Sequence, residues 1–192
     1  LLKYRKKASS DGILCELGLE RNSYALMTLH RPSNVDSRTN FVSILDALAE
    51  IQRRIKIILP IHPRTKARVE ELGLIDIISG MDNLMIIEPL GYLNFMGLMV
   101  NSRFVLTDSG GMQTETTVLN IPCLTLRENT ERPETVREGT NILVGSNPKK
   151  IVAVARKIIG QRDIKSRLQK LKNPFGDGQA SRKIIAETLR QR

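Results

Sequence analysis

FVLTDSGGMQTETTVLN, residues 104–120, is an apolar run that turns through Asp-Ser-Gly-Gly into a segment with a helical pattern. We expect a buried strand at 104–110 and a helix at 111–120 directly behind it. A buried strand followed at once by a helix is the repeating unit of parallel α/β sheets. This stretch therefore predicts the class of the fold.

The same alternation continues on both sides of this stretch. Further strands are expected at 24–30, 55–62, 83–90, 122–127 and 141–145, and further helices at 40–54, 63–73, 94–102 and 149–159. In the helix at 40–54, apolar residues recur at helical spacing, and Thr39 or Asn40 is its candidate cap. Residues 173–179, NPFGDGQ, predict a break before a last helix at 180–192. The sequence thus predicts an α/β fold with a doubly wound parallel sheet, as one domain over residues 1–192.

Composition limits the class of protein. With 192 residues, 41% of them hydrophobic, the chain is long enough for one domain with its own core. No apolar run approaches the roughly 18 residues that span a membrane, and no signal peptide is recognisable, so we expect a cytoplasmic location. Cys15 and Cys123 are expected to be buried thiols. The chain opens without Met, which leads us to expect a piece of a longer protein.

The net charge of +10 lies at the end of the chain. Residues 147–192 hold 13 Lys and Arg against 3 Asp and Glu, which accounts for all of it. Aromatic residues make up only 4% of the chain, so bases have few rings on which to stack. We interpret the basic tail as solvated helix faces and expect no nucleic-acid partner.

The predicted strands end in polar residues. Both histidines of the chain stand at such ends, His30 followed by Arg31 and His62 followed within two residues by Arg64. Ligands of parallel α/β sheets bind at the carboxyl ends of the strands. Two histidines with neighbouring arginines at this edge predict a site for an anion.

The turn at 108–111 strengthens this prediction. Its glycines allow a ligand close to the backbone, and the following helix offers free N–H groups and the positive end of its dipole. His30, Arg31 and Arg132 are candidates to bind phosphate oxygens. Glu115, one turn into the helix, is a candidate to accept hydrogen bonds from two ribose hydroxyls, although plain compensation of the helix dipole also explains an acid there.

Other cofactor classes are not indicated. The chain has neither G-x-G-x-x-G nor G-x-x-x-x-G-K, so neither NAD nor ATP is predicted. No His, Cys or Asp cluster has the spacing of metal ligands, and we expect no metal.

Six strings resemble a known family. They are TLHRPSNVD, ILPIHPRT, EPLGYLNFMGLM, LTDSGGMQTE, LRENTERPETVREGTN and NPFGDGQASRKI. They occur in this order in the non-hydrolysing UDP-N-acetylglucosamine 2-epimerases, and the match runs from about residue 13 to the end. The resemblance implies a Rossmann-like C-terminal domain of a GT-B-type fold, the half that binds the UDP-sugar. It also implies a missing N-terminal domain with the acid–base carboxylates, a last helix at 180–192 that crosses back to that domain, and a homodimeric whole protein.

The resemblance also implies roles for single residues. His30 is the catalytic candidate beside the diphosphate, Leu90 and Phe95 frame the uracil, Ser109, Gly110 and Gly111 hold the diphosphate, Glu115 takes the ribose, and Arg132 binds near the phosphates and the sugar. Arg31 and His62 resemble residues of a second, regulatory UDP-N-acetylglucosamine site. Ser33 stands where the family usually has an acid.

The implied reaction inverts C2 of the sugar, giving UDP-N-acetylmannosamine, by elimination of UDP and its re-addition without a cofactor. Two other functions stay open. A glycosyltransferase half would share the fold but is expected to show an E-x(7)-E motif, which is missing. The third possibility is a stand-alone module that binds a UDP-sugar.

Overall fold

A single parallel sheet forms the centre of the computed structural model, which describes residues 1–4 and 12–190. The six strands lie in the order β3-β2-β1-β4-β5-β6. Their bounds are β1 Tyr24–Thr28, β2 Lys56–Pro60, β3 Leu84–Ile87, β4 Phe104–Thr107, β5 Cys123–Thr125 and β6 Asn141–Leu143. In the middle of the sheet, Leu26 of β1 pairs with Ile58 of β2 and with Val105 of β4. The predicted doubly wound parallel sheet is confirmed.

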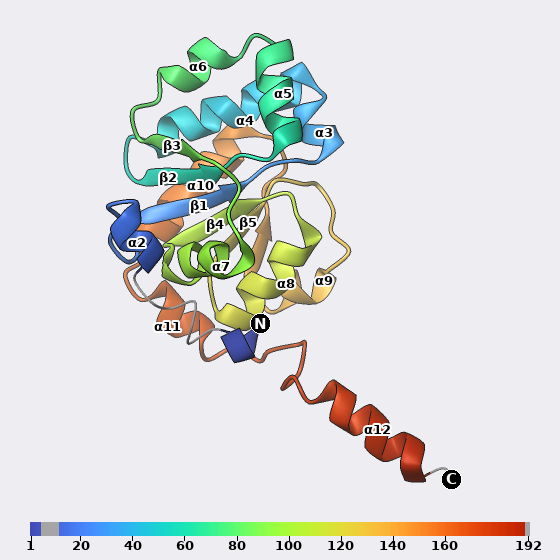
Figure 1. Ribbon diagram of the computed structural model, residues 1–192. Coiled ribbons are helices and arrows are strands. Elements are labelled where there is room, and N and C mark those ends of the chain that lie inside the picture. Colours follow the sequence, from blue (N-terminus) through green and yellow to red (C-terminus); the bar gives the residue numbers. More distant parts are fainter. Residues whose placement is uncertain (5–11, 191–192) are drawn as a thin grey trace.

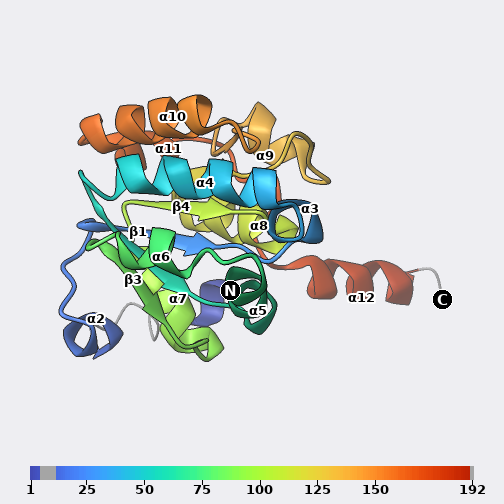
Figure 2. The same cartoon turned by 90° about the horizontal axis from the view of Figure 1, so that it is seen from above.

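Helices cover both faces of the sheet (Figures 1 and 2). One face packs against α3 Pro32–Val35, α4 Arg38–Ile51, α5 Pro63–Glu71 and α10 Pro148–Gly160, and the other against α2 Gly12–Glu16, α7 Tyr92–Asn101 and α8 Gly110–Leu119. Side chains alternate along each strand, so Ala25 and Met27 enter the first core while Tyr24 and Leu26 enter the second. The remaining helices are α6 Ile75–Ser79, α9 Pro133–Arg137, α11 Ile164–Leu168 and α12 Ala180–Arg190.

Two local predictions are wrong. Helix α4 is capped by Ser37, whose hydroxyl accepts the N–H of Asn40, and not by Thr39 or Asn40. Cys15 is exposed, whereas Cys123 is buried as predicted. The short helix α2, which the sequence pattern did not predict, turns Ile13 and Leu14 into the core and leaves Cys15 outside.

The last helix leaves the body of the domain. α12 extends away from the sheet in both views (Figures 1 and 2), and none of its residues is buried. Its apolar stripe, Ile184, Ile185 and Leu189, is 64%, 59% and 65% exposed. The helix therefore does not pack on the core of its own domain, and its crossing to another domain stays a prediction. None of the helices described is both long and apolar enough to cross a membrane.

Candidate functional site

A pocket of about 220 Å³ opens at the carboxyl ends of the central strands. It is lined by Thr28, Leu29, His30, Pro60, His62, Pro89, Leu90, Phe95, Ser109 and Met112. Five predicted site residues thus share one pocket, although they come from four loops and from α7. The sheet order explains this, because β1 lies between β2 and β4 and the loops that follow these strands converge.

The two histidines lie next to each other in this pocket. Their ring centroids are 5.6 Å apart, with the ring planes inclined by 34°. Nδ1 of His30 lies 3.3 Å from Oδ1 of Asp108. Nδ1 of His62 accepts the backbone N–H of Arg64 at 3.1 Å and so caps α5. Since Nδ1 of His62 is used in this way, Nε2 is the nitrogen that His62 can offer to a ligand.

Asp108 fixes the loop that carries His30. Its side chain is fully buried and accepts the backbone N–H of His30 at 3.0 Å, the backbone N–H of Arg31 at 2.8 Å and the amide of Asn34 at 3.3 Å. Nε of Arg31 in turn donates to the Asp108 carbonyl at 3.1 Å. The sequence analysis placed Asp108 only in a turn and missed this role. The one available signal was a carboxylate directly after a buried strand, a position where a partner is needed.

The amino-terminal end of α8 is open to a ligand. Ser109 is its N-cap residue, but the Ser109 side chain makes no capping hydrogen bond. The Ser109 side chain therefore leaves the N–H groups of the first turn unused, and the predicted binding of an anion there stays a prediction. Gly110 leaves little room beside it, since a Cβ there would lie 3.3 Å from Oε2 of Glu131.

The loop between β5 and α9 brings charged side chains, among them Glu131, close to the start of α8. Glu131 forms a double hydrogen bond with Arg127, both distances being 2.8 Å, and lies 3.5 Å from Nη2 of Arg31. The hydrogen bonds from Arg127 lower the pKa of Glu131 to about 2. Glu131 is therefore a fixed anion and a weak base.

Glu115 lies on α8, one turn beyond Gly111, and does not line the pocket. Burial raises the pKa of its carboxyl group. Tyr92 lies nearby, at the start of α7. Burial is the main cause that raises the pKa of Tyr92, and the Glu115 carboxylate raises it further. Glu115 is therefore half-buried between α8, which has Ser109 as its N-cap, and α7, which carries Phe95.

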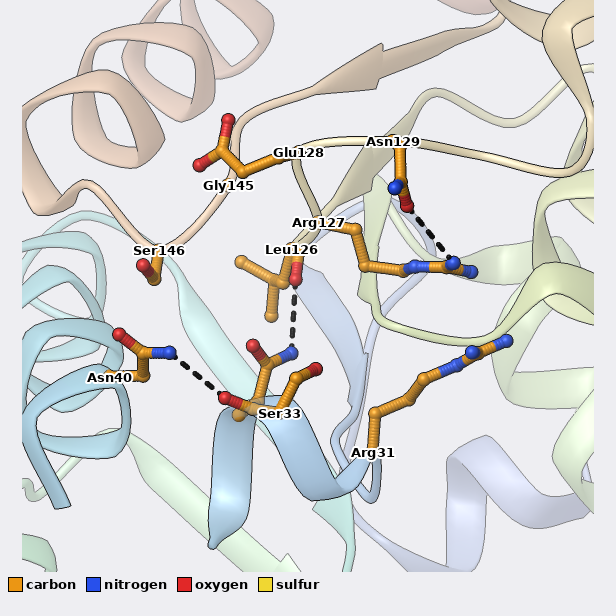
Figure 3. Close-up of a pocket in the computed structure, with 10 residues that line it drawn as sticks. Arg31, Ser33, Asn40, Leu126, Arg127, Glu128, Asn129, Gly145 and Ser146 are labelled. Carbon is orange, nitrogen blue, oxygen red and sulfur yellow. Dashed lines mark hydrogen bonds between the residues drawn. The ribbon is translucent and has the colours of Figure 1, made fainter. Parts of the chain in front are cut away.

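A second hollow, of about 260 Å³, is shown in Figure 3. It is lined by Arg31, Ser33, Asn34, Asn40, Leu126, Arg127, Glu128, Asn129, Gly145 and Ser146. Arg31 borders this hollow, whereas His62 borders the first pocket. The structure therefore does not bring Arg31 and His62 around one pocket, and their shared regulatory role stays a prediction.

Arg132 begins α9 as its N-cap residue and lines neither hollow. Its backbone N–H donates to the hydroxyl of Thr130 at 2.9 Å, and its carbonyl accepts from the hydroxyl of Thr135 at 2.7 Å. Within the described part of the chain, no three His, Cys, Asp or Glu side chains gather as metal ligands would.

The chain is similar to known proteins over nearly its whole length. A family model described as UDP-N-acetylglucosamine 2-epimerase matches residues 1–189. A UDP-N-acetylglucosamine 2-epimerase of Methanocaldococcus jannaschii is 43% identical over 166 residues, 85% of this chain and 44% of that protein. A UDP-2,3-diacetamido-2,3-dideoxy-D-glucuronate 2-epimerase of Pseudomonas aeruginosa is 39% identical over 165 residues, 85% of this chain and 42% of that protein.

Solved structures give the same result. The crystal structure of the M. jannaschii UDP-N-acetylglucosamine 2-epimerase in complex with UDP-N-acetylglucosamine and UDP matches with a TM-score of 0.85 and 39% identity. That match covers 98% of this chain and 51% of the solved one. The chain thus spans about half the length of the relatives it matches.

Proposed function

Since the chain belongs to the UDP-N-acetylglucosamine 2-epimerase family, we propose that it is the UDP-sugar-binding half of an enzyme that inverts C2 of the sugar in UDP-N-acetylglucosamine. One observation carries the proposal. The pocket with His30, Leu90 and Phe95 opens beside the uncapped start of α8. An apolar slot next to an anion site is what a uracil linked to a diphosphate requires.

The residues divide the ligand between them. Leu90 and Phe95 hold the uracil, and Glu115 holds the ribose. The first turn of α8, from Ser109 through Gly110 and Gly111, takes the diphosphate. Arg132 approaches the phosphates and the sugar from the β5–α9 loop.

The proposed chemistry needs two contributions. Elimination of UDP requires a base at C2 and stabilisation of the charge that develops on the departing diphosphate. The start of α8 supplies the second, and His30 stands where it can hold or move a proton at the diphosphate. The carboxylates for acid–base work belong to an N-terminal domain of the whole protein. We propose that the whole protein is a cytoplasmic homodimer, and that α12 crosses from this domain to the N-terminal one.

Another UDP-sugar and another reaction class are the alternatives to this proposal. The P. aeruginosa relative is named for a different UDP-sugar, and the uridine diphosphate part of the site serves both substrates. A glycosyltransferase half is disfavoured because the chain lacks the E-x(7)-E motif expected of that class.

Glu115 provides the test of nucleotide recognition. If its carboxylate accepts two ribose hydroxyls, Glu115→Gln should weaken UDP binding by about tenfold or more, the range for a hydrogen bond to a charged group. Binding of inorganic pyrophosphate should stay unchanged, because pyrophosphate has no ribose. Isothermal titration calorimetry with both ligands measures the two effects.

The control is Glu187→Gln on the exposed helix α12, which should alter neither affinity. An unchanged UDP affinity together with a lower melting temperature would mean that Glu115 only compensates the helix dipole.

A further inference from the structure

A ring of hydrogen bonds surrounds the backbone of Arg132. The Thr130 hydroxyl accepts the Arg132 N–H and itself donates to Oε1 of Gln113. On the other side, the Thr135 hydroxyl donates to the Arg132 carbonyl at 2.7 Å and accepts from Nδ2 of Asn141 at 3.1 Å. Asn141 closes the ring, because its Nδ2 also donates to Oε1 of Gln113 at 3.0 Å.

The amide of Asn141 bonds on both sides. Its Oδ1 accepts from the Thr125 hydroxyl at 2.6 Å, and its Nδ2 is turned toward Gln113. Oε1 of Gln113 is therefore the acceptor that joins the two halves of the ring. Gln113 and Asn141 are 0% and 1% exposed, so water does not compete for these bonds.

In this orientation, the amide nitrogen of Gln113, Nε2, is buried and makes no hydrogen bond with the described residues. An unpartnered buried donor is unfavourable for folding. A Leu side chain at this position would avoid the unpartnered donor, but it would also remove the acceptor of the Thr130 hydroxyl and of one N–H of the Asn141 amide.

The position of Gln113 on α8 connects the ring to the site. Gln113 follows the uncapped first turn, Gly110 and Gly111, on the same helix. Its Oε1 ties the β5–α9 loop to that helix. The first turn of α8 and the backbone of Arg132 are thus held together by one set of hydrogen bonds.

We propose that Gln113 is a positioning residue that sets Arg132 against the start of α8, so that one diphosphate contacts both. This rests on the proposed function, in which Arg132 and α8 share the phosphates. Gln113 acts through Thr130 and does not touch the ligand. The consequence is that Gln113 matters for UDP binding only while Arg132 is present.

A double-mutant cycle followed by UDP calorimetry on this chain tests the proposal. Arg132→Ala should weaken UDP binding by about 10- to 150-fold, and Gln113→Leu by about tenfold. In the Arg132→Ala background, Gln113→Leu should change the affinity by less than about twofold, because the group it positions is gone.

Thr130 tests the same link without a change in the core of α8. Thr130→Val removes the hydroxyl and should match the loss caused by Gln113→Leu, whereas Thr130→Ser keeps the hydroxyl and should retain the affinity. The control is Thr116→Val, since the buried Thr116 hydroxyl bonds the carbonyls of Met112 and Gln113 and the Cys123 thiol, and takes no part in the ring. Thr116→Val should lower the melting temperature and leave UDP affinity unchanged.

The outcomes separate the two proposals. If the unaltered chain does not bind UDP, the proposed function fails, and this inference fails with it. If UDP binds and Arg132→Ala weakens it, but Gln113→Leu has no effect or the same effect in both backgrounds, only the positioning role is overturned.

Discussion

Asp108→Ala is expected to lower the free energy of unfolding by about 3–5 kcal/mol, since each buried donor left unpaired costs about 1–3 kcal/mol. The substitution removes the acceptor of two backbone N–H groups, those of His30 and Arg31, and of the Asn34 amide. The loop that carries His30 would lose its anchor, so UDP binding should fall as well. Urea unfolding followed by circular dichroism measures the stability.

The matched control is Asp46→Ala, which removes an exposed carboxylate from α4. A surface change of this kind is expected to stay within about 0.5 kcal/mol. A loss below about 1 kcal/mol for Asp108→Ala would contradict the role assigned to Asp108, because the loop would then be held by other contacts.

The second large effect concerns turnover. We expect the 192-residue chain to bind UDP-N-acetylglucosamine without exchanging the proton at C2. Removal of that proton needs a positioned base with a suitable pKa and a cleft that excludes water. Glu131, with a pKa of about 2 and two hydrogen bonds from Arg127, is too weak a base. The pocket itself supplies His30 and His62 as groups that can transfer a proton, and no carboxylate is among the described residues that line it.

Proton NMR of the sugar in deuterated water measures this exchange. The chain should introduce no deuterium at C2 above the background, whereas the whole protein that contains it should do so at about 1 per second or faster, a rate ordinary for enzymes. Deuterium entering at such a rate with the chain alone would place the catalytic base within these residues.

The sequence predicted the strands well because each is a short apolar run followed by a polar residue. All six expected strands are present, each a few residues shorter than its apolar run. Five of the ten pocket residues were also named from the sequence, partly from their place at strand ends and partly from the family resemblance. Both kinds of signal are local in the sequence, so they do not depend on the order of strands in the sheet.

Contacts between distant segments were not predictable in this way. Asp108 meets His30 only because β4 lies beside β1, and Gln113 meets Asn141 only because β6 follows β5 at the edge of the sheet. Smaller errors have local causes. The Ser37 cap lies two or three residues before the expected Thr39 or Asn40, and Cys15 faces outward on a helix too short to show a periodic pattern.

Calorimetry of this chain with UDP and with ADP shows whether the pocket beside α8 recognises a uridine nucleotide. Both ligands carry the same ribose and diphosphate, so any difference between them reports on the slot formed by Leu90 and Phe95. We predict that UDP binds and that ADP binds at least about tenfold more weakly, a difference of about 1.4 kcal/mol. Equal affinities for UDP and ADP would contradict the account.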